Sequence, residues 1–179
     1  MEWNSLEKSD FVILNYTLTN NNSTNLSDIY SGIYLDWDIA NSIRNKTLFN
    51  TESRLSYSWY TGQTNLYTGV KLLSPINGYH YAFDVTETGS GGINISDGIS
   101  NSELFEALTT NRNEAGVSAN GNEIATLVSY GPLQIASHDS VVLSYALLAS
   151  NSLYNLENGA AEAQALYDSL YISTPLNNF

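Results

Sequence analysis

Short runs of β-branched and aromatic residues, each ending in a cluster of turn-forming residues, recur along the 179-residue chain. The run from Phe11 to Thr19 alternates between apolar and polar residues in its second half, which is typical of a β-strand with one buried face. The asparagine-rich stretch 20–25 follows, and Asn favours turns because its side chain bonds the nearby main chain. The next run extends from Asp28 to Asp38. We expect these two runs to pair as a hairpin.

The same pattern predicts several further strands and two helices. A helix over 102–108 would begin at Asn101 or Ser102, whose side chains can cap the first turn. From Leu153 to Leu170, apolar residues recur at spacings of three and four, which predicts an amphipathic helix. The further strands are expected at 54–60, 67–73, 79–85, 123–130 and 140–149. Residues 1–179 are therefore predicted to form one mainly β domain, an antiparallel β-sandwich of about eight strands with a short internal helix and a C-terminal amphipathic helix.

Charge and composition disfavour several classes of function. The chain has 18 Asp and Glu against 6 Lys and Arg, so its formal net charge is −12. Such a surface repels phosphate backbones and anionic headgroups, and no apolar run reaches the roughly 18 residues of a membrane span. We therefore expect no nucleic-acid partner and no membrane insertion. The absence of Cys excludes disulfides, thiolate zinc sites and cysteine nucleophiles.

Neutral polar residues replace much of the usual surface charge. Only 13% of the residues are charged, while Asn, Ser and Thr are abundant and 13 residues are Tyr. This composition is typical of an extracellular β-rich domain. The first eight residues show no signal-peptide pattern, and the sequence stops shortly after Pro175. We therefore expect the chain to be a fragment of a longer secreted protein.

Several stretches follow the order of strand patterns and turn residues of one known family. They are Phe11 to Asn20 with Ile29 to Ile39, Gly69 to Ser74, and Gly131 to Ala149 with Ala161 to Tyr167. Together they resemble the non-catalytic β-rich region that follows the protease domain in secreted subtilisin-like serine proteases of bacteria that use type IX secretion. The likeness covers most of the chain, but it rests on strand patterns and turn residues rather than on residues of a reaction.

The resemblance implies a location and a neighbourhood for the chain. It implies a non-catalytic accessory domain of a secreted or cell-surface bacterial subtilisin-like protease, with the neighbouring domains of that protein as partners. The nucleophile, histidine and aspartate motifs of the protease have no counterpart in this sequence. No activity is therefore carried over, and the chain itself is not expected to be an enzyme or to need a cofactor.

Two histidines are the only imidazole bases of the chain. His80 is expected in the middle of a strand, and His138 is expected in an exposed turn between two strands. A hydrolytic triad needs such a base within hydrogen-bond reach of an activated Ser. No Gly-x-Ser-x-Gly elbow is present in the sequence. A structural role for both histidines is therefore favoured over hydrolysis.

Asp36 and Asp38 flank Trp37 and would share one face of a strand, with side chains roughly 6–7 Å apart. Such a pair could supply oxygen ligands to calcium or act as the two carboxylates of a glycosidase. Both sites need more groups than one pair, since calcium takes about six to eight oxygens. A solvated strand end is the simplest interpretation, and calcium binding at these two residues is the alternative.

Aromatic residues among abundant Asn and Ser could bind a carbohydrate. Tyr57, Trp59 and Tyr60 form the expected ligand-binding group, and Tyr79 with Tyr81 is the alternative. Tyrosines two residues apart also pack within sheets, which is the competing interpretation. The second candidate function is therefore a carbohydrate- or protein-binding β-sandwich module on the cell surface.

Overall fold

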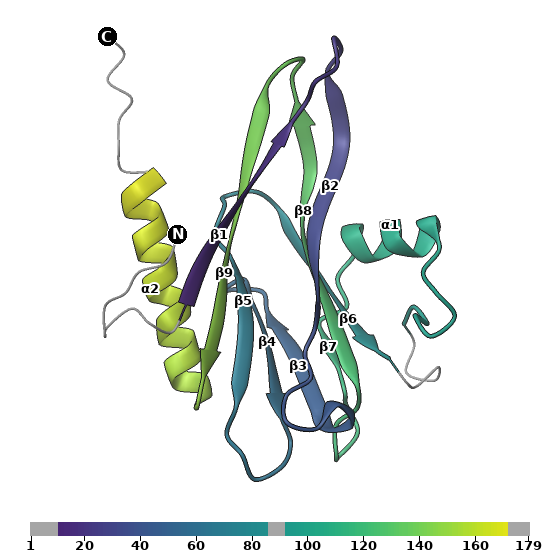
Figure 1. Ribbon diagram of the computed structural model, residues 1–179, viewed down its shortest axis with the longest axis vertical. Helices are drawn as coiled ribbons and strands as arrows, with labels where there is room; N and C mark the ends of the chain where they lie inside the picture. Colours follow the sequence, from purple (N-terminus) through teal and green to yellow (C-terminus); the bar gives the residue numbers. More distant parts are fainter. Residues whose placement is uncertain (1–10, 86–91, 172–179) are drawn as a thin grey trace.

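Two antiparallel sheets pack face to face, and a helix covers the outer face of each sheet (Figure 1). This arrangement comes from a computed structural model that describes residues 11–85 and 92–171. The described residues form nine strands, so the prediction of a mainly β antiparallel sandwich with one short and one C-terminal helix is confirmed.

The larger sheet has six strands in the order β1-β9-β5-β4-β3-β7. Its strands are β1 (Phe11–Thr19), β9 (Ser140–Ser150), β5 (Tyr67–Leu72), β4 (Leu55–Tyr60), β3 (Asn45–Asn50) and β7 (Glu114–Ala115). The helix α2 (Leu153–Tyr171) lies along the outer face of this sheet, against β1, β5 and β9.

The smaller sheet has three strands in the order β2-β8-β6, formed by β2 (Leu26–Asp36), β8 (Ile124–Ile135) and β6 (Gly78–Asp84). The helix α1 (Asn101–Thr109) lies on its outer face and contacts all three strands. A short 3-10 helix, η1 (Ser42–Arg44), leads from the smaller sheet into β3. The layer order is therefore α2, larger sheet, smaller sheet and α1.

The prediction that the first two strands pair as a hairpin is wrong. β1 pairs with β9 in the larger sheet, whereas β2 pairs with β8 in the smaller one. The chain therefore crosses between the sheets at 20–25, and it crosses back between β8 and β9. Together these four strands form a tip that projects beyond the rest of the sandwich (Figure 1).

Asn20 holds the two crossings together at this tip. Its side chain is 1% exposed, and Nδ2 lies 2.8 Å from the Thr24 carbonyl oxygen, 3.0 Å from that of Ile135 and 3.1 Å from that of Ala136. Its Oδ1 accepts a hydrogen bond from the Asn22 amide at 2.9 Å. One amide thus binds main-chain atoms of both crossings, which explains why a polar side chain is buried here.

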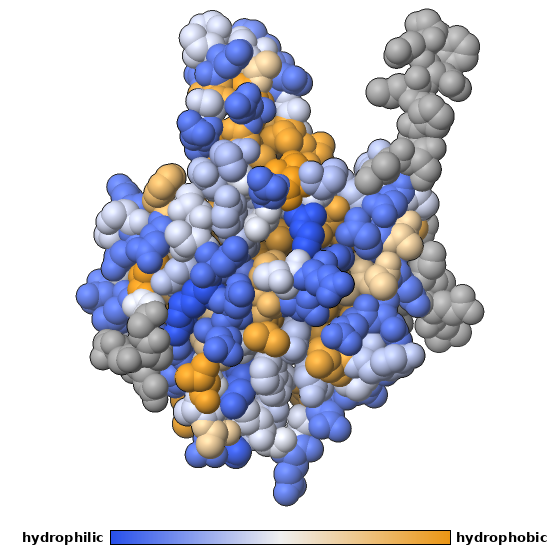
Figure 2. Space-filling model, turned by 180° about the vertical axis from the view of Figure 1, so that it is seen from behind, coloured by the Kyte–Doolittle hydropathy of each residue, from blue (hydrophilic) through white to orange (hydrophobic). Residues whose placement is uncertain are grey.

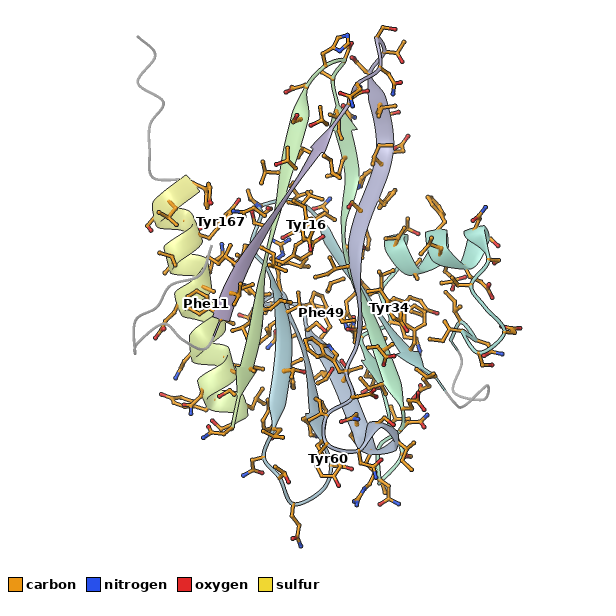
Figure 3. All side chains as sticks on the ribbon, in the orientation of Figure 1. Phe11, Tyr16, Tyr34, Phe49, Tyr60 and Tyr167 are labelled. Atoms are coloured by element: carbon orange, nitrogen blue, oxygen red, sulfur yellow. The ribbon has the colours of Figure 1, made fainter. Side chains whose placement is uncertain are left out.

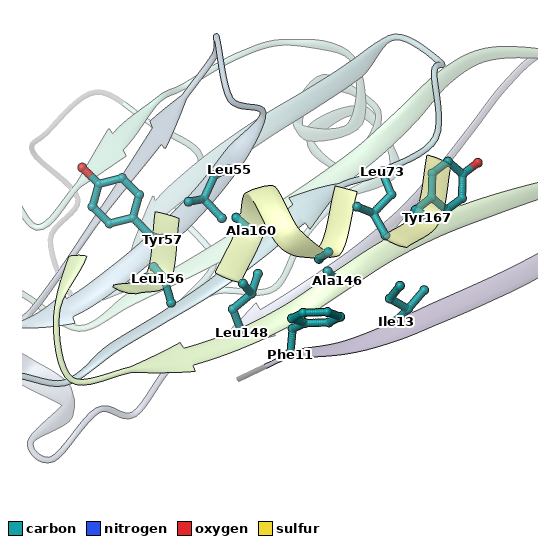
Figure 4. Close-up of a cluster of buried hydrophobic side chains, with 11 residues drawn as sticks. Phe11, Ile13, Leu55, Tyr57, Leu73, Ala146, Leu148, Leu156, Ala160 and Tyr167 are labelled. Carbon is teal, nitrogen blue, oxygen red and sulfur yellow. The ribbon is translucent and has the colours of Figure 1, made fainter. Parts of the chain in front are cut away.

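α2 is anchored by a stripe of small and apolar residues at helical spacing. Its buried residues are Leu156, Gly159, Ala160, Ala163 and Tyr167. They pack on apolar side chains of β1, β4 and β9 in the cluster drawn in Figure 4. The predicted helix over 153–170 is therefore confirmed, and the burial of β9 on both faces follows from this helix.

The core between the sheets mixes apolar residues with buried hydroxyls. Val70, Leu143 and Tyr145 of the larger sheet face Val128 and Tyr130 of the smaller one in a single buried cluster. The hydroxyls of three buried residues in the same layer have no hydrogen-bond partner among the described residues, namely Ser56, Ser58 and Thr126.

The segment 111–116 closes one side of the sandwich by bonding to both sheets. The main-chain amide of Arg112 donates to the His80 carbonyl of β6, and the Ala82 amide donates to the Arg112 carbonyl, both at 2.9 Å. The residues of β7 then pair with β3 of the larger sheet. None of the expected strands includes the short strand β7. The main-chain hydrogen bonds of Arg112 cover part of the edge of β6.

β3 was missed in the sequence because Asn45, Lys46 and Asn50 interrupt its apolar pattern. The helix expected at 102–108 is confirmed as α1, but its N-cap is Ser100 rather than Asn101 or Ser102. Residues 86–91 lie outside the described residues, and the segment 92–100, which leads into α1, contains no helix or strand.

Hydrophilic residues cover most of the face seen in Figure 2, and hydrophobic residues gather at the base of the projecting tip. Among the described residues, no helix is long and apolar enough to cross a membrane.

Candidate functional site

The outer face of the smaller sheet carries most of its aromatic residues. Because side chains alternate along a strand, Tyr30 and Tyr34 of β2 lie on the same face as Leu127 of β8. Every second residue of β6 also lies on this face, and these residues are Tyr79, Tyr81 and Phe83. Their spacing follows the strand period of two, so the sheet itself positions this aromatic surface.

α1 crosses this aromatic surface where the sheet has small residues. The Ser129 Oγ donates to the Leu108 carbonyl of α1 at 2.8 Å. A Cβ atom placed on Gly32 would lie 3.1 Å from Leu108 Cδ2 and 2.7 Å from the Val128 carbonyl oxygen. A larger residue at position 32 would therefore clash with the sheet and press on the helix, so Gly32 permits the close approach of α1.

The first turn of α1 is fixed by a capping box. The Ser100 Oγ accepts from the Glu103 amide at 3.3 Å, and a Glu103 carboxylate oxygen accepts from the Ser100 amide at 2.8 Å. Hydrogen bonds from Ser100 hold the pKa of the Glu103 carboxyl below its usual value. The cap fixes where the chain enters the helix and thus where Ile99 and Leu104 lie.

An apolar pocket lies between α1, the segment before it and the smaller sheet. We call it the α1 pocket. Its volume is about 420 Å³, and its lining includes Tyr34, Phe83, Leu127, Ile95, Ile99 and Leu104. Tyr34 is 52% exposed and extends toward the side of the molecule that carries α1 (Figure 3). The Tyr34 and Phe83 ring centroids are 6.0 Å apart. The pocket has the size and the aromatic lining of a small ligand or side-chain site.

A second group of rings lies beside α1 at Tyr30. The ring centroid of Tyr30 is 6.0 Å from that of Tyr79 and 5.7 Å from that of Phe105, with an edge-to-face arrangement in the second pair. Phe105 belongs to α1, and its side chain is 57% exposed even though its ring contacts Tyr30. An aromatic side chain this exposed on a short helix adds to the apolar surface around the helix.

The expected ligand-binding group of Tyr57, Trp59 and Tyr60 is divided by its strand. Tyr57 is buried under α2, and the half-buried Trp59 packs beside it with ring centroids 5.6 Å apart. Tyr60 is on the opposite face of β4, where the Arg44 guanidinium lies 5.6 Å from its ring centroid. The three rings therefore do not form one platform, and ligand binding at Trp59 stays a prediction. Of the alternative pair, Tyr81 is buried and Tyr79 is half-buried on the α1 side.

Asp36 and Asp38 are both exposed at the end of β2. The strand ends at Asp36, so Asp38 lies in the following irregular segment, where it lines a separate cavity with Trp37 and Tyr67. Partial burial raises the pKa of the Asp36 carboxyl, and the neighbouring charge of Asp38 raises it further. Within 11–85 and 92–171, no group of three or more His, Asp or Glu side chains gathers as a metal site. Calcium binding at this pair stays the alternative interpretation.

The two histidines lie far from each other. His80 is fully buried, its Nδ1 lies 3.2 Å from the Arg112 carbonyl oxygen, and its ring stacks on Phe49 with centroids 5.0 Å apart. Burial lowers the pKa of His80 to about 4. His138 is exposed at the projecting tip, as expected. His80 therefore lies in the core as a neutral ring, and His138 lies on the surface of the projecting tip.

Three basic side chains also point into the protein and bind main-chain carbonyls. Arg54 donates to Ser74 at 2.8 Å and to Ile76 at 2.6 Å, and Lys71 donates to Ser53. Arg112 donates to the Ala82 carbonyl at 2.5 Å and forms an ion pair with Asp84 at 2.7 Å. These cations therefore stabilise loops and the edge of a sheet.

The sequence did not predict the α1 pocket. The spacing of Tyr30, Gly32 and Tyr34 could have indicated that β2 presents aromatic residues around a small one. The position of α1 over Gly32 could not be read from that spacing.

No protein-family model matches the sequence, and no curated protein matches it.

Proposed function

We propose that the chain is a non-catalytic accessory domain of a secreted or cell-surface bacterial subtilisin-like protease. The strand pattern of the chain resembles the β-rich region that follows the catalytic domain in such proteases. Its partners would then be the neighbouring domains of the same protein.

The proposal is supported by the contacts that the inward-pointing basic side chains and the buried imidazole make inside the molecule. His80, Arg54, Lys71 and Arg112 contact main-chain carbonyl oxygens, so they serve to hold the fold. A general base must reach the proton that it removes from a substrate, and a fully buried imidazole is poorly placed for this. The buried imidazole of His80 and three of the basic side chains are thus engaged in structural contacts, and the exposed imidazole of His138 lies at the projecting tip.

A turnover assay of the purified chain tests the non-catalytic part of the proposal. We expect no hydrolysis above buffer of a generic nitrophenyl ester or of an unfolded casein substrate. Hydrolysis that disappears in the variant His80→Leu or His138→Gln would contradict the proposal. A folded control is needed for each variant, because His80 lies in the core.

A second candidate function is recognition of a polysaccharide or protein ligand. The α1 pocket favours it, since an apolar hollow with an exposed aromatic wall is a common form of binding site. A glycan array and a pull-down test this function, with Tyr34→Ala and Trp59→Ala as matched variants. Loss of binding in Tyr34→Ala alone would place the ligand at the α1 pocket. Loss in Trp59→Ala alone would place it at the aromatic group of β4 that the sequence predicted.

A further inference from the structure

On the side formed by the smaller sheet, α1 and the segment 92–100, the described charged side chains are acidic, apart from Arg112, which pairs with Asp84. The smaller sheet, α1 and the segment 92–100 contain neither Lys nor Arg. Asp84 at the end of β6 is neutralised by Arg112. The remaining acids of these elements, with the residue that precedes β8, are Asp28, Asp36, Asp97, Glu103, Glu106 and Glu123. We call this side the acid-only face.

Several of these acids lie beside the α1 pocket. Asp36 is two residues from Tyr34 on the same face of β2, and Glu123 directly precedes β8, the strand that pairs with β2. Burial raises the pKa of the Tyr34 hydroxyl, and the charges of Asp36 and Glu123 raise it further. Asp97 and Glu103 line a shallow hollow that shares Ile99 with the α1 pocket. Carboxylates therefore border the pocket from β2, from the end preceding β8 and from the start of α1.

Several apolar side chains on this face are exposed. Tyr34, Ile99, Leu104 and Phe105 are 52%, 43%, 40% and 57% exposed. Tyr34, Ile99 and Leu104 belong to one pocket, and Phe105 follows Leu104 in α1. Exposed apolar residues scattered singly need no explanation, but residues that share a pocket indicate a binding surface.

We infer that the α1 pocket binds a segment of a partner protein in which an apolar side chain is flanked by Lys or Arg. The apolar side chain would enter between Tyr34, Phe83 and Leu104. The flanking cations would lie near the carboxylates of the acid-only face, and the exposed ring of Tyr34 could also receive a cation on its face.

The charge on this face selects the class of partner. Nucleic acids are repelled by an acidic surface, and so are anionic membranes. A sugar needs polar groups that converge on its hydroxyls, whereas the side chains that line this pocket are apolar apart from the Tyr34 hydroxyl. A basic and apolar peptide fits both the acidic charge of the face and the apolar lining of the pocket. The inference rests on the second proposed function, recognition at the α1 pocket, and adds the class of ligand.

The test is a titration of the ¹⁵N-labelled chain with short blocked peptides, followed by amide chemical shifts. The probe has the sequence lysine-leucine-phenylalanine-lysine. We expect shifts at Tyr34, Ile99 and Leu104, and weaker binding when salt screens the charges, because the Debye length falls to about 8 Å at physiological ionic strength. The peptides glutamate-leucine-phenylalanine-glutamate and lysine-serine-serine-lysine separate the two requirements, and each is expected to bind at least about tenfold more weakly.

Matched variants keep the result specific to the pocket. Leu104→Ser is expected to weaken binding about tenfold, since it removes one apolar contact of the pocket. Tyr154→Ser is its control, because Tyr154 is 72% exposed on α2, far from α1 in the layer order. Asp36→Asn with Glu123→Gln is expected to weaken binding and to reduce its salt dependence, while Glu162→Gln on α2 changes neither. The amide spectra show whether each variant is folded.

The outcomes separate this inference from the function on which it rests. Equal binding of the acidic peptide, or shifts confined to other parts of the chain, would overturn the cationic partner. Cellohexaose that binds at the pocket when the basic peptide does not would also overturn it, while recognition at the pocket would stand. Binding of neither probe by the folded chain would count against both.

Discussion

Arg112 and Asp84 form an ion pair across 2.7 Å that ties the segment 111–116 to the β6 edge of the smaller sheet. Asp84 is almost fully buried, and its other carboxylate oxygen accepts from the Gly116 amide at 2.8 Å and from the Asn122 side chain at 3.2 Å. The carboxylate thus joins β6 to the strand β7 region of the opposite sheet. The pair closes the side of the sandwich between β6 and β3.

Removing the arginine should destabilise the fold strongly. Arg112→Met leaves the Asp84 carboxylate buried without its cation, and breaking one partner of a buried pair costs about 3–5 kcal/mol. Urea unfolding measures this loss. Glu114→Gln is the control, because this exposed neighbour should change the free energy of unfolding by less than about 0.5 kcal/mol. A loss below about 1 kcal/mol in Arg112→Met would show that the pair does not hold this edge.

Stability should fall in acid because of His80. Its pKa is about 4 in the folded chain and 6.5 for the ordinary imidazole, so the unfolded chain binds the proton more tightly. The contribution of the neutral ring is complete above pH 6.5 and is lost progressively as the pH falls from 6.5 to about 4. The full loss is up to about 3 kcal/mol.

The variant His80→Leu isolates this effect. We expect the free energy of unfolding to depend less steeply on pH between about 6.5 and 4 in His80→Leu than in the natural chain. His138→Gln should keep the steep dependence, since His138 is exposed at the tip. Identical slopes for His80→Leu and the natural chain would mean that the buried ring does not control acid stability.

The unpartnered hydroxyl of Thr126 predicts a stabilising substitution. Thr126 is fully buried, and its Oγ1 has no partner among the described residues. Thr126→Val removes the cost of burying that hydroxyl, so we expect the free energy of unfolding to rise by about 1 kcal/mol. Thr47→Val is the matched opposite case, because the Thr47 Oγ1 donates to the Tyr57 carbonyl at 3.1 Å. We expect the free energy of unfolding to fall by about 1 kcal/mol in this variant. Destabilisation by both substitutions would indicate that Thr126 is hydrogen-bonded, for example to buried water.

Thermal melts with calcium and with a chelator test the predicted pair of Asp36 and Asp38. Two carboxylates supply at most about four of the six to eight oxygens that calcium takes. We therefore expect the same melting midpoint in both conditions. A higher midpoint in calcium that is lost in Asp38→Asn would show the opposite, namely that these two residues are ligands.

The local features of the fold could be predicted from the sequence. The alternation in 11–19 and the helical spacing in 153–170 are properties of a few neighbouring residues, and both elements are present. Strand pairing depends on distant residues. Asn20 bonds to Ile135, which is 115 positions away, so the crossing between sheets at 20–25 resembled an ordinary hairpin turn.

The candidate site was harder to predict for the same reason. The α1 pocket combines Tyr34, Leu127 and Phe83 from three strands with Ile99 and Leu104 from the entry to α1. No stretch of the sequence contains that set. By contrast, strand alternation alone would have placed Tyr60 on the face opposite Tyr57 and Trp59, and so excluded the three-residue platform.

Sequencing the gene upstream of the coding region for this chain tests most directly whether the chain is the accessory domain that we propose. We expect a subtilisin-like catalytic domain encoded in the same reading frame immediately before residue 1. A gene that encodes this chain alone would contradict the proposed function.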